Sequence, residues 1–327
     1  MVRDRLAGLG AIRATVDAAS APTDPSATWK RSYGGGELLQ VACPLCGCGA
    51  GSDIAHEFGI VIARCRACGV VFTRTPLPDS QRHYAVARSV IEEKYARILS
   101  READHPRTAN YHEHLALLER LTAGRSLLDV GAHCGFFLDV ARSRGWCTTG
   151  VEPSPVTSAL AQERFGLDVH CGTLDDLPLP AASFHVVTLV DVFEHMPDPR
   201  RTLEQIGRLL CFGGRLFIKV PNVRYVIAKY RLLRRSRLVD DAFDAREHLV
   251  HYSIATLGRL LRMTGFEIEE TSVSSPINSG ASWQRAIRAA GPALARRLPH
   301  GVASPLATDI SVVARSWRTA DRTAPFS

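Results

Sequence analysis

The cysteines of the N-terminal third include two closely spaced pairs. Cys43 and Cys46 form one Cys-x-x-Cys pair, Cys65 and Cys68 form the other, and 18 residues separate the pairs. Four thiolates at this spacing are typical of a tetrahedral zinc ribbon. A closed set of four leaves no open coordination position, so we predict a structural zinc. Cys48 is a spare thiol that competes with Cys46 for the ligand role.

A second group of residues suits a nucleoside ligand. Asp129 ends a buried apolar run, and Gly131 and Gly135 follow it in a turn that leads into a helical segment. Glycines let the backbone approach a ligand, and a helix N-terminus offers N–H donors. Glu152 ends the next apolar run, where a carboxylate can accept both ribose hydroxyls. His133 either lines this pocket or is a helix-start residue with a partly exposed ring.

Acidic and histidine side chains follow the fourth expected strand. Asp191, Glu194 and His195 are spaced i, i+3, i+4, which places them on one face if the segment is helical. Three roles are open: His195 is a general base, the three side chains hold a second divalent metal, or Glu194 and His195 only cap and orient the helix. Farther on, alternation allows only one of His248 and His251 to face the site, and we expect His248.

Apolar strand-like runs alternate with helical segments after residue 124. This alternation predicts an α/β fold, in which helices cover both faces of a Rossmann-like sheet. Helices are expected to begin near 135, 155, 198 and 253. The expected strands number seven, at 126–131, 147–151, 167–170, 184–190, 215–220, 266–273 and 308–315.

The composition indicates one large domain and a small module in 327 residues. Prolines, glycines and the cysteine pairs mark the boundaries. We expect a flexible segment at 1–36, a zinc ribbon at 37–80, linking helices at 81–122, and a main domain at 123–327 with a lid at 222–250 and an insertion at 276–305.

The net charge of +7 favours anionic partners. The segment 224–237 has six basic residues and no acidic one. It either touches an anionic membrane surface, clamps an anionic substrate, or is a lid with a solvated face. There is no run of 18 apolar residues and no signal-peptide pattern at the start, so we expect a cytoplasmic protein. The expected ribbon lacks basic, aromatic-rich strands, which argues against a nucleic-acid partner.

The stretch from 127 to 222 resembles class I S-adenosylmethionine (SAM)-dependent methyltransferases of the ubiquinone-biosynthesis and cell-surface-glycan type. The motifs that carry the resemblance are LLDVGAHCGFFL, TGVEPSP, GTLDDLPLPAASFHVVTLVDVFEHMPDP and LEQIGRLLCFGGRLFIKVPN, followed by REHLVHYSIATLGRLLRMTGFEI. The resemblance implies that SAM is the cofactor. It places Asp129, Gly131 and Gly135 around the methionine part, Glu152 at the ribose, and Thr173 and Leu174 beside the adenine.

The sequence departs from that family pattern at a few positions. His133 stands where many relatives have a second glycine, His185 replaces an aspartate, and Cys211-Phe212 replaces Lys-Pro. The ribose acid and the outer glycines are kept. Cysteine pairs of this form also resemble those of methyltransferases that act on sugars or glycans.

The expected activity is therefore O-methylation of a hydroxyl on a sugar, glycan or other small metabolite. A zinc-ribbon enzyme that modifies RNA and a dinucleotide-dependent oxidoreductase are the alternatives. A tight G-x-G-x-x-G loop would favour the oxidoreductase, and it is absent. The acceptor and the oligomeric state are open.

Overall fold

The computed structural model describes residues 33–78, 87–234, 241–274 and 303–317, with a few residues between 290 and 297. The expected flexible segment at 1–36 and the insertion at 276–305 lie largely outside the described residues. So does the end of the basic segment, after residue 234.

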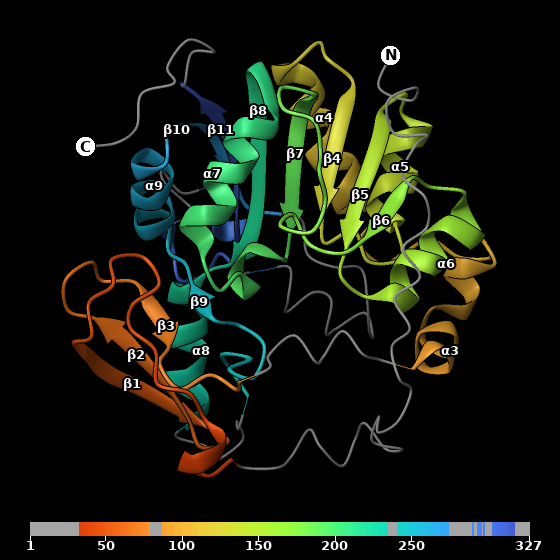
Figure 1. Cartoon of the computed structure of the whole chain (residues 1–327). Helices are drawn as coiled ribbons and strands as arrows, with labels where there is room; N and C mark the ends of the chain where they lie inside the picture. The colour runs from red at the N-terminus through yellow and green to blue at the C-terminus, as the bar shows by residue number, and fades with distance from the viewer. Residues whose placement is uncertain are drawn as a thin grey trace.

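The large sheet has seven strands, as the sequence predicts (Figure 1). Their order across the sheet is β10-β11-β8-β7-β4-β5-β6. The five strands from β8 to β6 run parallel, whereas β11 is antiparallel to both of its neighbours. The strands span Ser126–Val130 (β4), Cys147–Glu152 (β5), Val169–Cys171 (β6), Phe184–Val190 (β7), Leu210–Pro221 (β8), Phe266–Ser272 (β10) and Asp309–Ser316 (β11).

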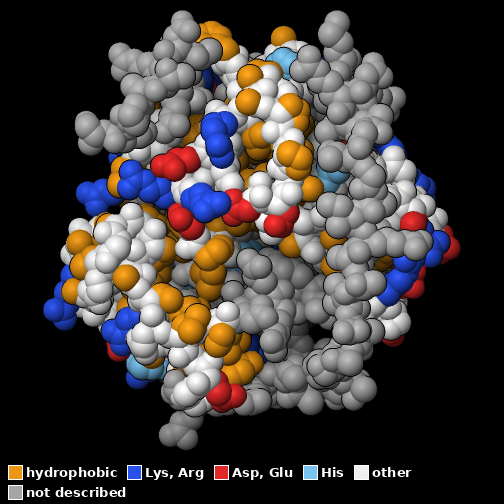
Figure 2. All heavy atoms as spheres, in the orientation of Figure 1, with side chains coloured by type: hydrophobic (Ala, Val, Ile, Leu, Met, Phe, Trp, Pro, Cys, Tyr) orange, Lys and Arg blue, Asp and Glu red, His pale blue; other side chains and the backbone are white. Residues whose placement is uncertain are grey.

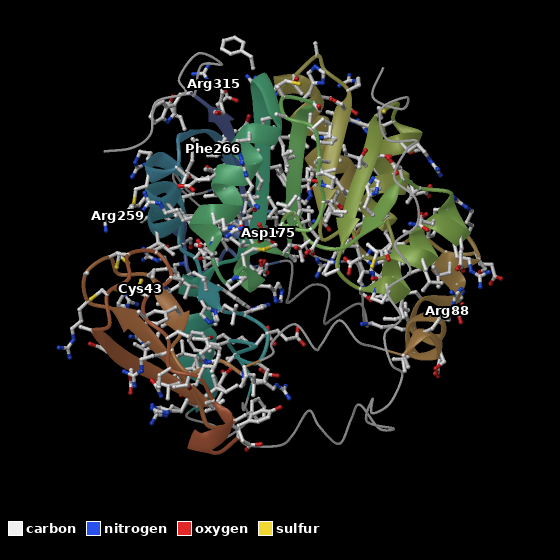
Figure 3. All side chains as sticks on the ribbon, viewed as in Figure 1. Cys43, Arg88, Asp175, Arg259, Phe266 and Arg315 are labelled. Carbon is white, nitrogen blue, oxygen red and sulfur yellow. The ribbon has the colours of Figure 1, made fainter. Side chains whose placement is uncertain are left out.

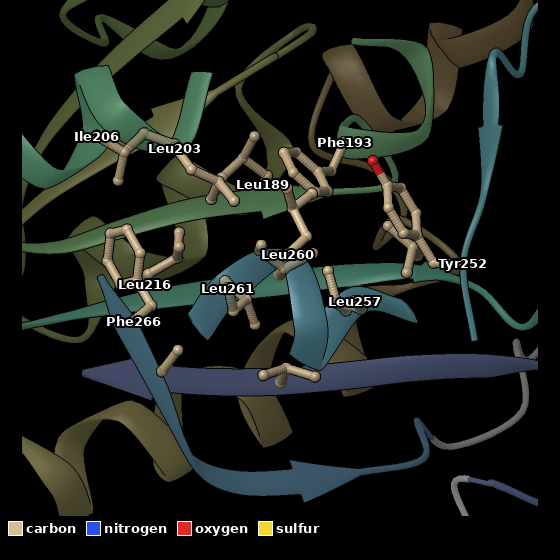
Figure 4. Packing of buried hydrophobic residues seen from close by; sticks show 14 of the residues in the cluster. Leu189, Phe193, Leu203, Ile206, Leu216, Tyr252, Leu257, Leu260, Leu261 and Phe266 are labelled. Atoms are coloured by element: carbon tan, nitrogen blue, oxygen red, sulfur yellow. The ribbon is translucent and has the colours of Figure 1, made fainter. Parts of the chain in front are cut away.

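Helices cover both faces of this sheet because successive strand residues point to opposite sides. Leu127 packs with one hydrophobic cluster, which includes residues of α4, α5 and α6, and Leu128 packs with the other, which includes residues of α7 and α9. Figure 4 shows the second cluster, where Leu203 and Leu260 face the strands. The helices span Arg88–Leu99 (α3), Thr108–Leu121 (α4), Phe136–Ser143 (α5), Pro155–Phe165 (α6), Pro199–Leu209 (α7) and Ile254–Met263 (α9).

Local capping explains where three helices begin. Ser154 accepts a hydrogen bond from the backbone N–H of Thr157 at the start of α6, and Asp198 does the same for α7. Ser253 caps α9, as the sequence suggests. Such caps satisfy backbone N–H groups that have no partner inside the helix. The caps of α6 and α7 fix the connections that follow the parallel strands β5 and β7.

A second, four-stranded antiparallel sheet lies beside the carboxyl ends of the parallel strands (Figure 1). A short 3₁₀ turn, η1 (Gly35–Glu37), precedes it. Its first three strands come from the cysteine region, but the fourth, β9, comes from the segment before α9. The strands are β1 (Gly51–Glu57), β2 (Ile60–Cys65), β3 (Val71–Thr73) and β9 (Val250–His251).

The small sheet shares its core with the large domain. Cys43, Leu45 and Phe72 belong to the same buried cluster as Tyr252 and Leu257 of the main domain. Burial of this apolar surface on both sides favours a fixed arrangement of the two parts. The cysteine region is therefore packed as an extension of the large domain.

The basic segment forms helix α8 (Val223–Arg234), which covers the small sheet. Val223 and Val226 are buried against that sheet, whereas Arg224, Arg231 and Arg234 are exposed. On the face in Figure 2, basic side chains lie among acidic ones. Within the described residues, no helix has the length and apolar character needed to cross a membrane. Peripheral membrane contact through α8 stays a prediction.

Candidate functional site

The structure brings four cysteine sulfurs together at one end of the small sheet. The Sγ atoms of Cys43 and Cys68 are 3.5 Å apart, and those of Cys46 and Cys65 are 3.6 Å apart. All four Sγ atoms lie within 4.8 Å of one another. A tetrahedral ion with bonds of about 2.3 Å to sulfur needs sulfurs about 3.8 Å apart, so the cluster has the right size for zinc. The spare Cys48 lies outside the cluster, and its Sγ faces the Ala50 carbonyl.

A cavity of about 780 Å³ opens at the carboxyl edge of the large sheet. Asp175, which lines it, lies at this edge in Figure 3, and Cys43 lies in the small module. The volume falls in the range of small-molecule sites. Ligands of open α/β sheets bind at this edge because the connecting loops converge there. Most of the residues that the sequence assigns to a cofactor line this cavity: Asp129, Gly131, His133, Glu152, Thr173 and Leu174.

The Glu152 carboxylate is held at the end of β5 by two backbone N–H groups. Oε2 accepts from the N–H of His133 at 2.8 Å, and Oε1 accepts from the N–H of Ser154 at 2.9 Å. Burial raises the pKa of Glu152, and these two N–H groups oppose the rise. Each carboxylate oxygen has further lone pairs. The side chain is therefore pre-positioned to accept hydrogen bonds from a ligand in the cavity.

Asp129 lies on β4, the neighbour of β5 in the sheet, one residue before the end of the strand. Its Oδ1 accepts a hydrogen bond from the Thr188 hydroxyl of β7 at 2.6 Å. The pKa of Asp129 is raised to about 7, mainly by burial and also by the charge of Glu152, while the hydrogen bond from Thr188 opposes the rise. The two acids thus lie close enough to influence each other's protonation. A ligand that donates hydrogen bonds or carries positive charge would favour the ionised forms.

Two glycines shape the turn between β4 and α5. Gly131 and Gly135 each have a φ of 78°, which is unfavourable for a residue with a side chain. A Cβ on Gly131 would overlap Val192, and one on Gly135 would overlap Leu167. Sequence reasoning assigned these glycines to backbone approach toward a ligand. Gly131 lines the cavity and Gly135 does not, and at both positions neighbouring side chains occupy the space that a Cβ would need.

His133 and Thr173 both line the cavity. The His133 ring contacts Tyr95 edge-on, and burial lowers its pKa to about 4, so the ring is neutral. The Thr173 N–H and hydroxyl both donate to Oδ2 of Asp176, which fixes the loop after β6. Leu174 follows in the same loop and also lines the cavity. All three of these residues therefore line the cavity into which the cofactor is expected to bind.

Asp191 follows β7 with a left-handed φ of 55°. Its Oδ1 accepts from Lys219 Nζ at 2.6 Å, and Oδ2 pairs with Arg107. The backbone N–H of Asp191 also donates to the Lys219 carbonyl. Two cations therefore hold this carboxylate, and the structure does not bring it together with Glu194 and His195. Asp191 lines the cavity as part of an ion-pair network.

Glu194, His195 and His248 form a compact cluster instead. The segment after Asp191 is a 3₁₀ turn, η3 (Phe193–His195), rather than the α-helical turn on which the expected spacing depended. One ligand atom of each of the three residues lies within 4.8 Å of the others. His195 lines the cavity, and the His248 ring lies behind it with 4.8 Å between ring centroids.

Glu194 is buried, the two histidines are half-buried, and the cluster has specific polar partners. Nδ1 of His195 lies 3.0 Å from the Glu247 carbonyl oxygen, which can only accept. The bond therefore places the proton on Nδ1 and a lone pair on Nε2. Burial raises the pKa of Glu194 to about 7, and burial lowers the pKa of His248 well below its usual value. Oε2 of Glu194 is buried without a hydrogen-bond partner in the described part of the chain.

The other expected histidine, His251, is in β9. It is buried against Thr73 and Phe243 rather than in the cavity. Neither of the two histidines lines the cavity, but His248 lies in the cluster with Glu194 and His195, whereas His251 does not.

Sequence reasoning missed the residues that the linking helices contribute. Tyr95, His105, Arg107 and Tyr111 all line the cavity. The His105 ring stacks on Phe136 with 4.8 Å between centroids, and burial lowers its pKa to about 4. In the sequence, aromatic and basic residues gather around the start of α4, but their spacing does not identify a ligand site.

Comparisons with known proteins agree with this arrangement. A family model described as "Methyltransferase domain" matches residues 91–271, more than half of the chain. A ubiquinone biosynthesis O-methyltransferase of Coxiella burnetii is 27% identical over 115 residues, which are 34% of this chain and 49% of that protein. A probable S-adenosylmethionine-dependent methyltransferase of Mycolicibacterium smegmatis is 30% identical over 165 residues, covering 49% and 60%. The matched stretch thus spans about half the length of these relatives.

A solved SAM-dependent methyltransferase from Thermotoga maritima has 19% sequence identity and a TM-score of 0.47. The match covers 72% of this chain and 99% of that one. The family match over residues 91–271 decides the assignment, and the chain belongs to the SAM-dependent methyltransferases with a class I fold.

Proposed function

We propose that the chain methylates a hydroxyl of a sugar, glycan or other small metabolite, with His195 as the general base. The observation that carries this proposal is the orientation of the His195 ring at the cavity. Its Nδ1–H is held by the Glu247 carbonyl, so Nε2 has the lone pair that removes a proton. Similarity to O-methyltransferases of ubiquinone biosynthesis supports an oxygen acceptor.

The cofactor assignment follows the residues around the glycine turn. SAM supplies a methyl group on a positively charged sulfur, which needs little more than an aligned nucleophile. We assign its ribose hydroxyls to Glu152, its adenine to Thr173 and Leu174, and its methionine part to Asp129 and the turn that follows. The fixed Glu152 carboxylate supports this assignment, since both oxygens keep lone pairs toward the cavity.

His195 would act on the acceptor side of that cofactor. SAM would supply the methyl group, and its carbon–sulfur bond would break as the acceptor oxygen bonds to the methyl carbon, which leaves the neutral thioether S-adenosylhomocysteine. His195 would take the hydroxyl proton at Nε2, and its ring would become positively charged. The nearby Glu194 carboxylate stabilises that charge. The rest of the cluster keeps the ring in place and excludes water from one side.

A divalent metal is the second candidate for this cluster, and one observation favours it. Glu194 Oε2 is a buried acceptor without a partner among the described residues, and a metal ion would satisfy it. Glu194, His195 and His248 would hold the ion, and Asp191 would not. The ion would acidify the acceptor hydroxyl.

A methyl-transfer screen tests the proposed function. Purified protein with methyl-labelled SAM is incubated with separate panels of sugars, lipid-linked glycans, phenols and RNA. We expect label in a small-molecule or glycan hydroxyl, with an O-methyl ether identified by mass spectrometry. Label on RNA alone, or on carbon or nitrogen of the acceptor, would overturn it.

We also propose that the four-cysteine cluster holds one structural zinc. The Cys65→Ser variant should bind much less zinc and should be cleaved faster by protease within residues 37–80, because metal binding contributes to folding of such modules. Metal analysis and limited proteolysis check both. Cys48→Ser is the matched control, since Cys48 lies outside the cluster. Full zinc content in Cys65→Ser would show that the ligand set is wrong.

A further inference from the structure

The segment 241–251, which follows α8 in the sequence and ends with β9, is in contact with the candidate catalytic cluster. The Glu247 carbonyl accepts from His195 Nδ1 at 3.0 Å. The Leu249 N–H donates to the Glu194 carbonyl at 2.9 Å. His248 packs edge-on against His195. The position of this segment therefore determines the position of the His195 ring.

The cysteine module holds the first end of this segment through Glu57, the last residue of β1. Its Oε1 accepts from the backbone N–H groups of Ala242 at 2.7 Å and Phe243 at 3.0 Å. Glu57 is only 2% exposed. A buried carboxylate is unfavourable unless it is hydrogen-bonded, and these bonds go to a segment 185 residues away in the chain. The main polar contacts of this acid are thus with segment 241–251.

Thr73, the last residue of β3, holds the second end. Its hydroxyl donates to the His248 carbonyl at 2.6 Å, and its N–H donates to the Leu249 carbonyl at 3.0 Å. The adjacent residues of β3 pair with β9. Thr73 is 1% exposed, so water does not compete for these bonds.

We infer that Glu57 and Thr73 are positioning residues, through which the cysteine module holds segment 241–251 and sets the places of His195 and His248. The four-cysteine cluster stabilises the turn that joins β2 to β3, because Cys65 ends β2 and Cys68 lies in that turn. The module therefore contributes to the site although no cysteine reaches the cavity. The effect of these residues on catalysis rests on the proposed role of His195, whereas their effect on the position of segment 241–251 does not.

The test uses the full chain with its metal and replaces Thr73 by valine, which keeps the shape but not the hydroxyl. Hydrogen exchange measured by mass spectrometry should become about tenfold faster in 241–251, as expected for loss of a buried hydrogen bond. The ring signals of His195 and His248 should shift in NMR spectra. Zinc content and SAM affinity should equal those of the parent protein.

Thr264→Val is the matched control. The Thr264 hydroxyl is equally buried and donates to the Leu260 carbonyl at 2.9 Å, in α9 and away from the segment. Thr264→Val should leave hydrogen exchange in 241–251 and the ring signals of His195 and His248 unchanged. If Thr73→Val also leaves them unchanged, or if it releases the zinc, the positioning role is wrong.

If Thr73→Val does not fold, two variants of Glu57 test the positioning role instead. Glu57→Gln keeps an oxygen for the two N–H groups and should behave like the parent protein. Glu57→Leu removes it and should speed exchange at 241–245 about tenfold. Equal exchange in both variants would overturn the inference. These readouts need no methyl acceptor, so they remain valid if His195 is not the base.

Discussion

His195→Ala is expected to lower methyl-transfer turnover by about 10²–10⁴-fold, the usual contribution of a general base. SAM affinity should change less than about twofold, because the ring acts on the acceptor and not on the cofactor. Turnover is measured with labelled SAM and the acceptor found by screening, and affinity is measured by calorimetry. The exposed His112→Ala, on α4, is the matched control and should keep full turnover.

Mild chelation distinguishes the base from the metal. Activity that is lost and then restored by magnesium or manganese would support an ion held by Glu194, His195 and His248. Activity that does not respond would support the base. The treatment must leave the cysteine-bound metal in place, which metal analysis confirms. Near-normal turnover of His195→Ala on the true acceptor would exclude both roles and leave only a structural one.

Glu152→Ala is expected to weaken SAM binding by about 10²–10⁴-fold. Two hydrogen bonds to a charged acceptor contribute roughly 1.5–3 kcal/mol each, and the loss of both gives a change of this size. Calorimetric titration of SAM into the variant measures it. The structural reason is that two backbone N–H groups hold the carboxylate at the cavity, so no other side chain can easily replace it.

Glu163→Ala provides the control for this change. Glu163 is an exposed acid on α6, which begins just after Glu152, and it pairs with Arg88 on the surface. SAM affinity of this variant should match that of the parent protein. Because Glu152 also binds two N–H groups, thermal unfolding without SAM must show that Glu152→Ala is folded. Unchanged affinity in a folded Glu152→Ala protein would remove the ribose assignment.

Local patterns in the sequence are enough to predict the large sheet and the edge at which the candidate site lies. Strand periodicity, turn glycines and N-caps act over a few residues, so they can be recognised without tertiary contacts. Parallel strands end at one edge, which is why Asp129 and Glu152 could be predicted to lie near each other. The cysteine pairs could also be predicted to converge, because their spacing matches the geometry of a metal ion.

The contacts by which distant segments complete the candidate site could not be predicted in this way and are seen only in the folded chain. Asp191 pairs with Arg107, which is 84 residues earlier in the chain, and its carboxylate is not part of the cluster formed by Glu194, His195 and His248. His248 joins those two residues instead, because β9 pairs with β3 of the cysteine module. The first contact depends on which segment packs beside the Asp191 carboxylate, and the second depends on which segment packs beside the edge of β3. The periodicity of the sequence does not predict which segments pack together, because the energy of a contact depends on burial and on neighbours that are present only after the chain has folded.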